Sequence, residues 1–162
     1  IGPALEALAA FTGAGRRFER LGETRGVIFV DDYAHHPTEL AATLQAARQA
    51  FPGRRLMAVF QPHLYSRTDR HGEAMGRALA AADVAIVTEI YAAREAPIPG
   101  VSGRRVAQAV SATGGKGIFE PDLVGVARRV TELARPGDVV LTLGAGDITR
   151  VGRELVAAWR AS

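Results

Sequence analysis

Two short polar stretches of this chain hold the side chains best suited to chemistry. Residues 31–39 (DDYAHHPTE) place three carboxylates, two imidazoles and a phenol directly after the apolar run 27–30. Residues 61–68 (QPHLYSRT) follow the apolar run 56–60 and add an imidazole and a guanidinium. An apolar β-branched run that ends in ionisable residues and then meets proline is typical of a strand, a turn and a helix start. Because open α/β sheets bind ligands at the carboxyl ends of their strands, both stretches are candidate parts of one site.

The side chains in these stretches favour a particular kind of reaction. Arg67 carries a permanent planar cation that suits a carboxylate or a phosphate. His35 and His63 can accept or orient a proton near neutral pH. Asp32 can accept hydrogen bonds from ribose hydroxyls, as acidic residues do in dinucleotide-binding folds. The combination predicts an anionic substrate that meets a nucleophile, with a nucleotide present.

The order of the strands decides whether these groups meet. Sequential strands of a parallel sheet often lie side by side, so we expect residues 27–31 and 56–60 to be neighbours whose carboxyl ends adjoin. The side chains that would then converge on one rim are Asp32, Tyr33, His35, His63 and Arg67. The turn 144–147 should join this rim, where its glycines would let a ligand or another domain approach closely. The helix after that turn would present the positive end of its dipole there.

Apolar and helical patterns alternate along the chain, which predicts a three-layer, Rossmann-like α/β domain with a mostly parallel central sheet. The expected strands cover residues 18–21 (an N-terminal edge strand), 27–31, 56–60, 84–88, 118–119 and 139–143. The expected helices cover residues 4–11, 37–47, 69–82 and 103–112, then a stretch from Pro121 to about 135 and one from about 148 to 159.

The composition limits the class of protein. At 162 residues and 48% hydrophobic content, the chain is the size of one globular domain with a full core. The absence of cysteine excludes disulfides and thiolate metal sites, which fits a cytoplasmic location. No apolar run approaches the roughly 18 residues of a membrane span, and the start of the chain lacks the basic flank of a signal peptide. The arginines are scattered, so we expect no nucleic-acid partner and no membrane partner.

Several of these residues also fit other roles. The His35–His36 pair is also typical of a capped helix start, and Asp31 is typical of a turn or an N-cap. Possible metal ligands are Asp31, Asp32, His35, His36, Glu39 and His63. No His-Glu-x-x-His spacing occurs and adjacent histidines point apart, so no protein-held metal is expected. A metal-dependent hydrolase and a stand-alone module for a nucleotide or acidic small molecule remain as competing hypotheses.

Phosphate-binding loops and nucleophile elbows are missing from the sequence. Gly115-Lys116 is followed by Gly117 and has no upstream glycine at the required position, so the P-loop pattern fails. The Gly-x-Gly turns at 13–15 and 144–146 lack the third glycine of the dinucleotide fingerprint. No Gly-x-Ser-x-Gly elbow occurs either. If the rim uses ATP, another domain is expected to hold most of the triphosphate.

Five segments, in this order, resemble the C-terminal domain of the Mur ligases: residues 11–18, 31–39, 60–68, 95–100 and 144–148. Within that family the chain is most similar to the branch that joins L-alanine to UDP-N-acetylmuramate. The resemblance implies that residues 1–162 are a single C-terminal domain of a three-domain enzyme. The lack of an initiator methionine also favours a piece of a longer protein, and this domain alone is expected to be inactive.

The resemblance further implies the partners and the reaction. The N-terminal domain of such an enzyme binds the UDP-sugar, and the central domain carries the ATP loop and most of the magnesium ligands. ATP phosphorylates the muramoyl carboxylate, and the L-alanine amine attacks the resulting acyl phosphate. ATP and Mg²⁺ are therefore expected in the full-length enzyme, with no cofactor held tightly by this domain alone.

The family motif also implies roles for individual residues. Arg17 and Asp32 are expected to contact the nucleotide. Four residues are expected to face the incoming alanine and the reacting centre. Tyr33 and Arg67 are expected to bind the substrate, and His35 and His63 are expected to be catalytic. The sharpest prediction is that Arg67 pairs with the alanine carboxylate. Leu64 stands where some members carry arginine, so binding of the amino acid is expected to depend more on Arg67. The nearest alternative within the family is a ligase that recycles a preformed peptide; Glu39 and residues 144–147 favour alanine instead.

Overall fold

The computed structural model describes residues 15–162, so the helix expected over residues 4–11 lies outside the described part. The strands are β1 (Glu19–Thr24), β2 (Val27–Asp32), β3 (Leu56–Phe60), β4 (Val84–Val87), β5 (Gly117–Phe119) and β6 (Val139–Leu143). The helices are α2 (Pro37–Ala50), α3 (Tyr65–Leu79), α4 (Gly103–Ala112), α5 (Leu123–Leu133) and α6 (Thr149–Ala161). The expected order of strands and helices along the chain is confirmed over this range.

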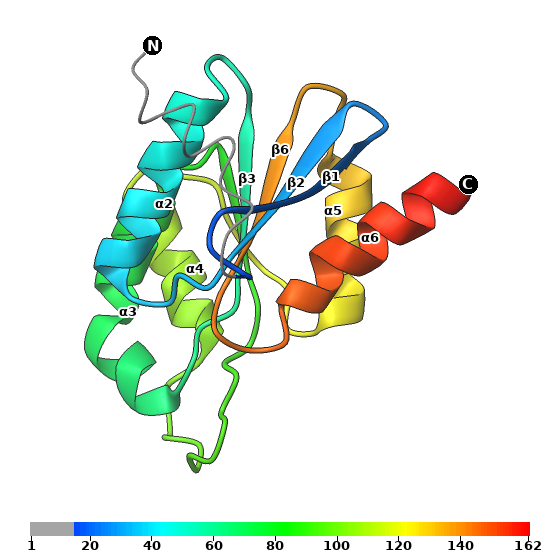
Figure 1. The fold of residues 1–162 in the computed structure, drawn as a ribbon. Coiled ribbons are helices and arrows are strands. Elements are labelled where there is room, and N and C mark those ends of the chain that lie inside the picture. The colour runs from blue at the N-terminus through cyan, green and yellow to red at the C-terminus, as the bar shows by residue number, and fades with distance from the viewer. Residues whose placement is uncertain (1–14) are drawn as a thin grey trace.

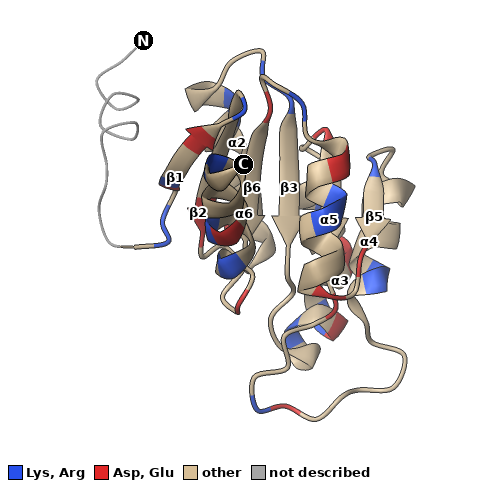
Figure 2. Cartoon of the chain, turned by 90° about the vertical axis from the view of Figure 1, so that its right-hand side faces the viewer, with Lys and Arg blue, Asp and Glu red and all other residues tan. Residues whose placement is uncertain are grey.

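The six strands form one sheet in the order β1-β2-β6-β3-β4-β5, with only β1 antiparallel to its neighbour. Helices α2, α3 and α4 cover one face, and α5 and α6 cover the other (Figure 1). This confirms the three-layer architecture with a mostly parallel sheet and an N-terminal edge strand. In the view of Figure 2, basic and acidic residues are interspersed along the helices.

The central strands are buried on both faces because helices cover the sheet from both sides. Along β3, Leu56 and Phe60 pack under α2, α3 and α4, whereas Met57 and Val59 pack under α5 and α6. All five residues of β3 are buried, as are all five of β6. This explains why these strands appear in the sequence as unbroken apolar runs rather than as alternating patterns.

The expected pairing of the first two central strands was wrong. Strand β6 lies between β2 and β3, with Leu143 in register with both Asp32 and Phe60. The crossover through α2 skips one position in the sheet, and the last strand of the chain fills it. Since all three strands run parallel, their carboxyl ends still meet at one edge, and the turn after β6 becomes its centre.

Two helix starts differ from expectation because of the residues that cap them. Helix α3 begins at Tyr65, four residues earlier than its apolar pattern suggested, because a carboxylate from a distant loop caps it. Helix α5 begins at Leu123 because Asp122 caps it through the Gly125 N–H at 2.7 Å, so Pro121 precedes the helix. None of the helices within residues 15–162 has both the length and the apolar character required to span a membrane.

Candidate functional site

The turn after β6 ties three strand ends together. Gly144 N donates to the carbonyl of Asp32 at 3.2 Å, and Gln61 N donates to the carbonyl of Leu143 at 3.0 Å. The Gln61 side chain donates to Asp147 Oδ1 at 2.7 Å and accepts from Ile148 N at 3.1 Å. These bonds confirm that the glycine turn 144–147 joins the rim formed by the ends of β2 and β3.

Gly146 has no room for a side chain. A Cβ at this position would lie 2.7 Å from the ring of Tyr91 and 2.5 Å from Oε1 of Gln61. The close approach lets the backbone of the turn pack directly beneath the aromatic ring. Here glycine is required by packing within the rim as it stands, in addition to any closeness that a ligand would need.

Asp31 is a structural anchor of this rim. Its carboxylate is fully buried and accepts hydrogen bonds from Arg16 Nε at 3.0 Å, Thr142 Oγ1 at 2.6 Å and Thr149 Oγ1 at 2.9 Å. Arg16 also donates to the carbonyl of Gly144, and its guanidinium lies 5.3 Å from the centroid of the Tyr33 ring. The interpretation of Asp31 as a turn former or N-cap was therefore wrong.

Arg16 is a residue that the sequence analysis missed. The doublet Arg16-Arg17 offers two identical side chains, and nothing in their spacing shows which one turns inward. The structure turns Arg16 toward Asp31 and leaves Arg17 exposed. Since only Arg16 has a buried carboxylate to pair with, its partner could be found only from the three-dimensional arrangement.

Asp32 and Arg17, the two predicted nucleotide contacts, line the same cleft. This cleft of about 210 Å³ is bounded by Arg17, Asp32, Tyr33, Ala34, Glu39, Ala42 and Thr43. Asp32 accepts hydrogen bonds from Phe18 N at 2.7 Å, Ala34 N at 2.8 Å and Thr43 Oγ1 at 3.3 Å. Burial raises the pKa of Asp32 above its ordinary value, against the lowering effect of these donors. Asp32 thus shapes the cleft as well as facing it.

The environment of His35 fixes which of its ring nitrogens carries a proton. Its Nδ1 atom lies 2.9 Å from the carbonyl oxygen of Tyr33, and a carbonyl can only accept. Nδ1 therefore carries the hydrogen, and Glu39 Oε2 at 3.5 Å from Nδ1 reinforces this arrangement. When the imidazole is neutral, this leaves Nε2 as a proton acceptor. The Tyr33 ring packs edge-on to His35 with centroids 5.2 Å apart.

His63 has the opposite tautomer. Its Nδ1 lies 3.0 Å from Nη1 of Arg67, and a guanidinium has no acceptor, so Nδ1 must accept. Burial, followed by the charge of Arg67, lowers the pKa of His63 below its ordinary value. The imidazole is thus neutral at pH 7 with its hydrogen on Nε2. The rings of His35 and His63 lie 6.1 Å apart between centroids, so the structure brings both predicted catalytic groups and Arg67 together.

His36 belongs to the scaffold of the site. It is the N-cap of α2, where its Nδ1 accepts from Thr38 N at 3.4 Å. Glu39 completes the capping box by accepting from the backbone N–H groups of His35 and His36 at 3.0 and 3.1 Å. Burial alone would raise the pKa of Glu39, but these donors and the two imidazoles lower it. The cap interpretation of the histidine pair thus holds for His36, while His35 turns into the rim.

A second, basic cleft opens beside Arg67. It encloses about 180 Å³ and is bounded by Leu64, Ser66, Arg67, Arg70 and His71. Ser66 and Arg67 stand in the first turn of α3, and the rings of His71 and His36 lie 5.0 Å apart. Arg67 therefore faces a region of positive charge that suits a carboxylate.

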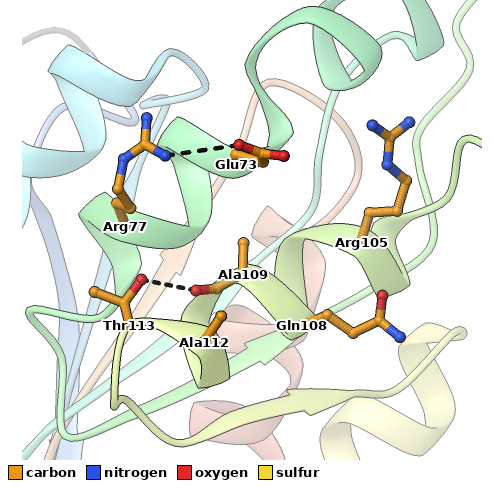
Figure 3. A pocket seen from close by; sticks show the side chains of 7 residues that line it. All are labelled: Glu73, Arg77, Arg105, Gln108, Ala109, Ala112 and Thr113. Carbon is orange, nitrogen blue, oxygen red and sulfur yellow. Dashed lines mark hydrogen bonds and ion pairs between the residues drawn. The ribbon is translucent and has the colours of Figure 1, made fainter.

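A larger cavity than either cleft lies elsewhere, between α3 and α4 (Figure 3). It measures about 460 Å³ and is bounded by Glu73, Arg77, Arg105, Gln108, Ala109, Ala112 and Thr113. None of the rim residues lines it. The Glu73–Arg77 pair is 3.9 Å apart and both side chains are exposed. The cavity lacks the converging imidazoles and carboxylates of the rim, so the rim is the better candidate site.

The six possible metal ligands do not form a metal site in the described part of the chain. Within residues 15–162, no three His, Cys, Asp or Glu side chains lie close enough together to hold an ion. Asp31 is occupied by Arg16 and two threonines, and His36 is occupied as a cap.

Curated proteins with similar sequences include UDP-N-acetylmuramate–L-alanine ligases. The UDP-N-acetylmuramate–L-alanine ligase of Mycolicibacterium vanbaalenii is 54% identical over 157 residues, which is 94% of this chain and 32% of that protein. The ligase of the same name from Salinibacter ruber is 49% identical over 152 residues, again covering 93% of this chain and 32% of that protein. The chain thus spans about a third of the length of the curated relatives it matches.

Solved structures agree with the fold. A UDP-N-acetylmuramate-alanine ligase from Thermotoga maritima matches with a TM-score of 0.78 and 28% identity, over 99% of this chain and 33% of that one. A murein peptide ligase from Psychrobacter arcticus shares the fold with a TM-score of 0.75 at 24% identity, over 95% of this chain and 32% of that one. Residues 16–146 match the family described as Mur ligase, glutamate ligase domain, and the chain belongs to this family.

Proposed function

We propose that this chain is the C-terminal domain of an ATP-dependent ligase that joins L-alanine to UDP-N-acetylmuramate in the synthesis of peptidoglycan precursors. The observation that carries this proposal is the continuous cluster of His35, His63 and Arg67, which lies on the same rim as the Arg17–Asp32 cleft. A cation for a carboxylate, a proton acceptor and a nucleotide contact are the groups that amide formation from an amino acid and ATP requires. Relatives at about half identity carry this name.

Arg17 and Asp32 would hold the nucleotide. Arg17 is exposed at the cleft, where its guanidinium suits a phosphate, and Asp32 offers a carboxylate to ribose hydroxyls. A cleft of about 210 Å³ accepts only part of an ATP molecule, so the remainder would lie against another domain. When bound, ATP supplies the phosphoryl group that activates the muramoyl carboxylate.

Arg67 and Tyr33 would bind the incoming amino acid. Within residues 15–162, Arg67 makes its hydrogen bonds through Nη1 alone. Its Nε and Nη2 atoms are therefore left to bind a carboxylate. Tyr33 is 43% exposed and stands between the nucleotide cleft and His35. This arrangement directs the alanine carboxylate toward α3 and its amine toward the two imidazoles.

The two histidines would divide the handling of protons. The alanine amine must lose a proton before it attacks a carbonyl, and the unprotonated Nε2 of His35 suits that role as a general base. Nε2–H of His63 is a donor that suits the oxygen on which negative charge develops. Because its pKa is lowered, His63 retains this neutral form at the pH of the cytoplasm.

The direct experiment is a reaction with the full-length protein. With ATP, magnesium, UDP-N-acetylmuramate and L-alanine, we expect stoichiometric ADP, phosphate and an alanylated UDP-sugar detected by mass spectrometry. Omission of alanine should abolish phosphate release. Replacement of alanine by a preformed peptide that begins with L-alanine tests the alternative acceptor. Product formation with the peptide and none with alanine would contradict the proposal.

Calorimetry on the isolated chain separates the ligase domain from a stand-alone nucleotide module. A domain that holds only part of the nucleotide should bind ATP weakly without the central domain, with no heat of binding at micromolar concentrations. Micromolar affinity of the isolated chain for ATP would favour the module. Stoichiometric metal in the purified chain would favour the metal-dependent hydrolase.

A further inference from the structure

Glu95 belongs to the stretch 95–100 that resembles the Mur ligases, and it lies on the loop between β4 and α4. In Figure 1 this loop extends past the edge of the sheet at which α2 and α3 begin. Neither the nucleotide contacts nor the proton-handling groups include this carboxylate. Its hydrogen bonds connect it instead to the helix that carries Arg67.

Helix α3 lacks a cap of its own. Its N-cap residue is Leu64, which has a positive φ of 72° and no side chain able to accept a hydrogen bond. Its first turn contains no acidic residue. The first N–H groups of a helix have no partner within the helix, so without a cap the first turn lacks hydrogen bonds that would stabilise it.

Glu95 supplies this cap from 29 residues away. Its Oε2 accepts from Ser66 N at 2.9 Å, and its Oε1 accepts from Ser66 Oγ. A carboxylate at this position satisfies a free N–H group and also opposes the positive end of the helix dipole. The hydroxyl and then the N–H of Ser66 lower the pKa of Glu95. The cap is therefore charged at neutral pH.

The same loop is attached at a second point, on the other side of His63. Leu64 N donates to the carbonyl of Tyr91 at 2.9 Å, and Tyr91 N donates to the carbonyl of Pro62 at 2.8 Å. The ring of Tyr91 stacks on His63 with centroids 5.6 Å apart and an angle of 13° between planes. The loop thus contacts residues 62–66, the segment that carries His63 and leads into Arg67, at two points.

We propose that Glu95 is a positioning residue for the acceptor amino acid, which acts through Ser66 on the first turn of α3 and so aims Arg67. Arg67 directly follows Ser66, and the direction of its side chain depends on how that turn is held. Glu95 does not touch the substrate in this scheme. The proposal rests on the proposed role of Arg67 in binding the alanine carboxylate.

Kinetics of the full-length ligase test this role. We expect Glu95→Ala to raise the KM for L-alanine about five- to tenfold, as for the loss of an N-cap, with kcat and the KM for ATP unchanged. Glu95→Gln should restore most of the affinity, because its amide oxygen can still accept from Ser66 N. Ser66→Ala should show a smaller rise and should add little to Glu95→Ala. Glu132→Ala, on the exposed face of α5, is the matched control.

An unchanged KM for alanine in Glu95→Ala, or a fall in kcat alone, would overturn the proposal. Failure of Glu95→Gln to restore the affinity would do the same. Hydrogen–deuterium exchange of the 162-residue chain provides a test without catalysis: exchange at residues 64–68 should rise in Glu95→Ala and stay near wild type in Glu95→Gln. If the wild-type enzyme consumed no alanine, the proposed function would be wrong. Faster exchange in Glu95→Ala would then show only that Glu95 caps α3, and its role in positioning the amino acid would be overturned.

Discussion

Nη1 of Arg67 lies 3.0 Å from Nδ1 of His63, and this contact determines which ring nitrogen of His63 carries the hydrogen. A guanidinium only donates, so Nδ1 accepts and the hydrogen sits on Nε2. The contact places a permanent cation against a titratable ring, which disfavours a second positive charge there. The same pair therefore joins the predicted acceptor site to the predicted proton-handling site.

The pKa of His63 is the first quantity to measure. Burial and the charge of Arg67 both lower it, so NMR of the ring protons should give a midpoint below the ordinary value of 6.5. Arg67→Gln should move the midpoint up toward 6.5, because the cation is removed. Arg70→Gln is the matched control, since Arg70 makes no hydrogen bond to His63. A midpoint above 6.5 in the wild type would contradict the geometry.

The lowered pKa also predicts a pH dependence of stability. The unfolded chain protonates His63 more readily than the folded chain does, so the folded state loses stability as the pH falls below about 6.5. The loss ends once the pH has passed through the lower folded pKa. The free energy of unfolding in urea should therefore fall between pH 7.5 and 5.5, and fall less in His63→Gln. Equal slopes in the two proteins would show that His63 does not contribute.

Two glycines on one helix should respond oppositely to the same substitution. A Cβ on Gly76 would lie 2.4 Å from Ala109 Cβ and 2.8 Å from the Val106 carbonyl, so Gly76→Ala should cost about 1–3 kcal/mol. A Cβ on Gly72 would meet its nearest neighbours at an ordinary 3.7 Å. Gly72→Ala should therefore stabilise α3 by up to about 1 kcal/mol through helix propensity. Thermal unfolding of both variants gives the comparison; the same sign for both would contradict the described packing of α3 on α4.

Arg16 should matter for stability far more than its neighbour. Arg16→Ala leaves the buried carboxylate of Asp31 without its cation, and we expect a loss of about 3 kcal/mol in the free energy of unfolding. Arg17→Ala, at an exposed position one residue away, should change it by less than about 0.5 kcal/mol. Urea denaturation distinguishes the two, and similar losses would show that Arg16 is not the anchor.

The sequence was sufficient to predict the layers, the parallel sheet and most of the elements. The apolar runs 56–60 and 139–143 and the helix 103–112 coincide with β3, β6 and α4. These elements are deeply buried, so the need to bury apolar side chains determines both their sequence pattern and their place in the structure. The strand order was not predictable in this way. Strand β6 comes late in the chain, and no local sequence pattern indicates that it lies between β2 and β3.

Most members of the site were predictable, although Arg16 was missed, but their contacts were not. Strand ends reveal which residues lie at the rim, and His35, His63 and Arg67 do meet there. The partners of Asp31 and the cap of α3 could not be predicted, because Arg16 and Glu95 act over 15 and 29 residues through side chains alone. Long-range polar contacts of this kind leave no periodic signal in a sequence.

The most direct test of the account is the dependence of the full-length enzyme on L-alanine when Arg67 is replaced by alanine. Loss of a charge-assisted hydrogen-bonding partner should raise the KM for L-alanine about 10–100-fold. The KM for UDP-N-acetylmuramate should stay unchanged, and Arg77→Ala, at an exposed position farther along α3, serves as the control. An Arg67→Ala enzyme with wild-type affinity for alanine would contradict the central claim that this rim receives the amino acid.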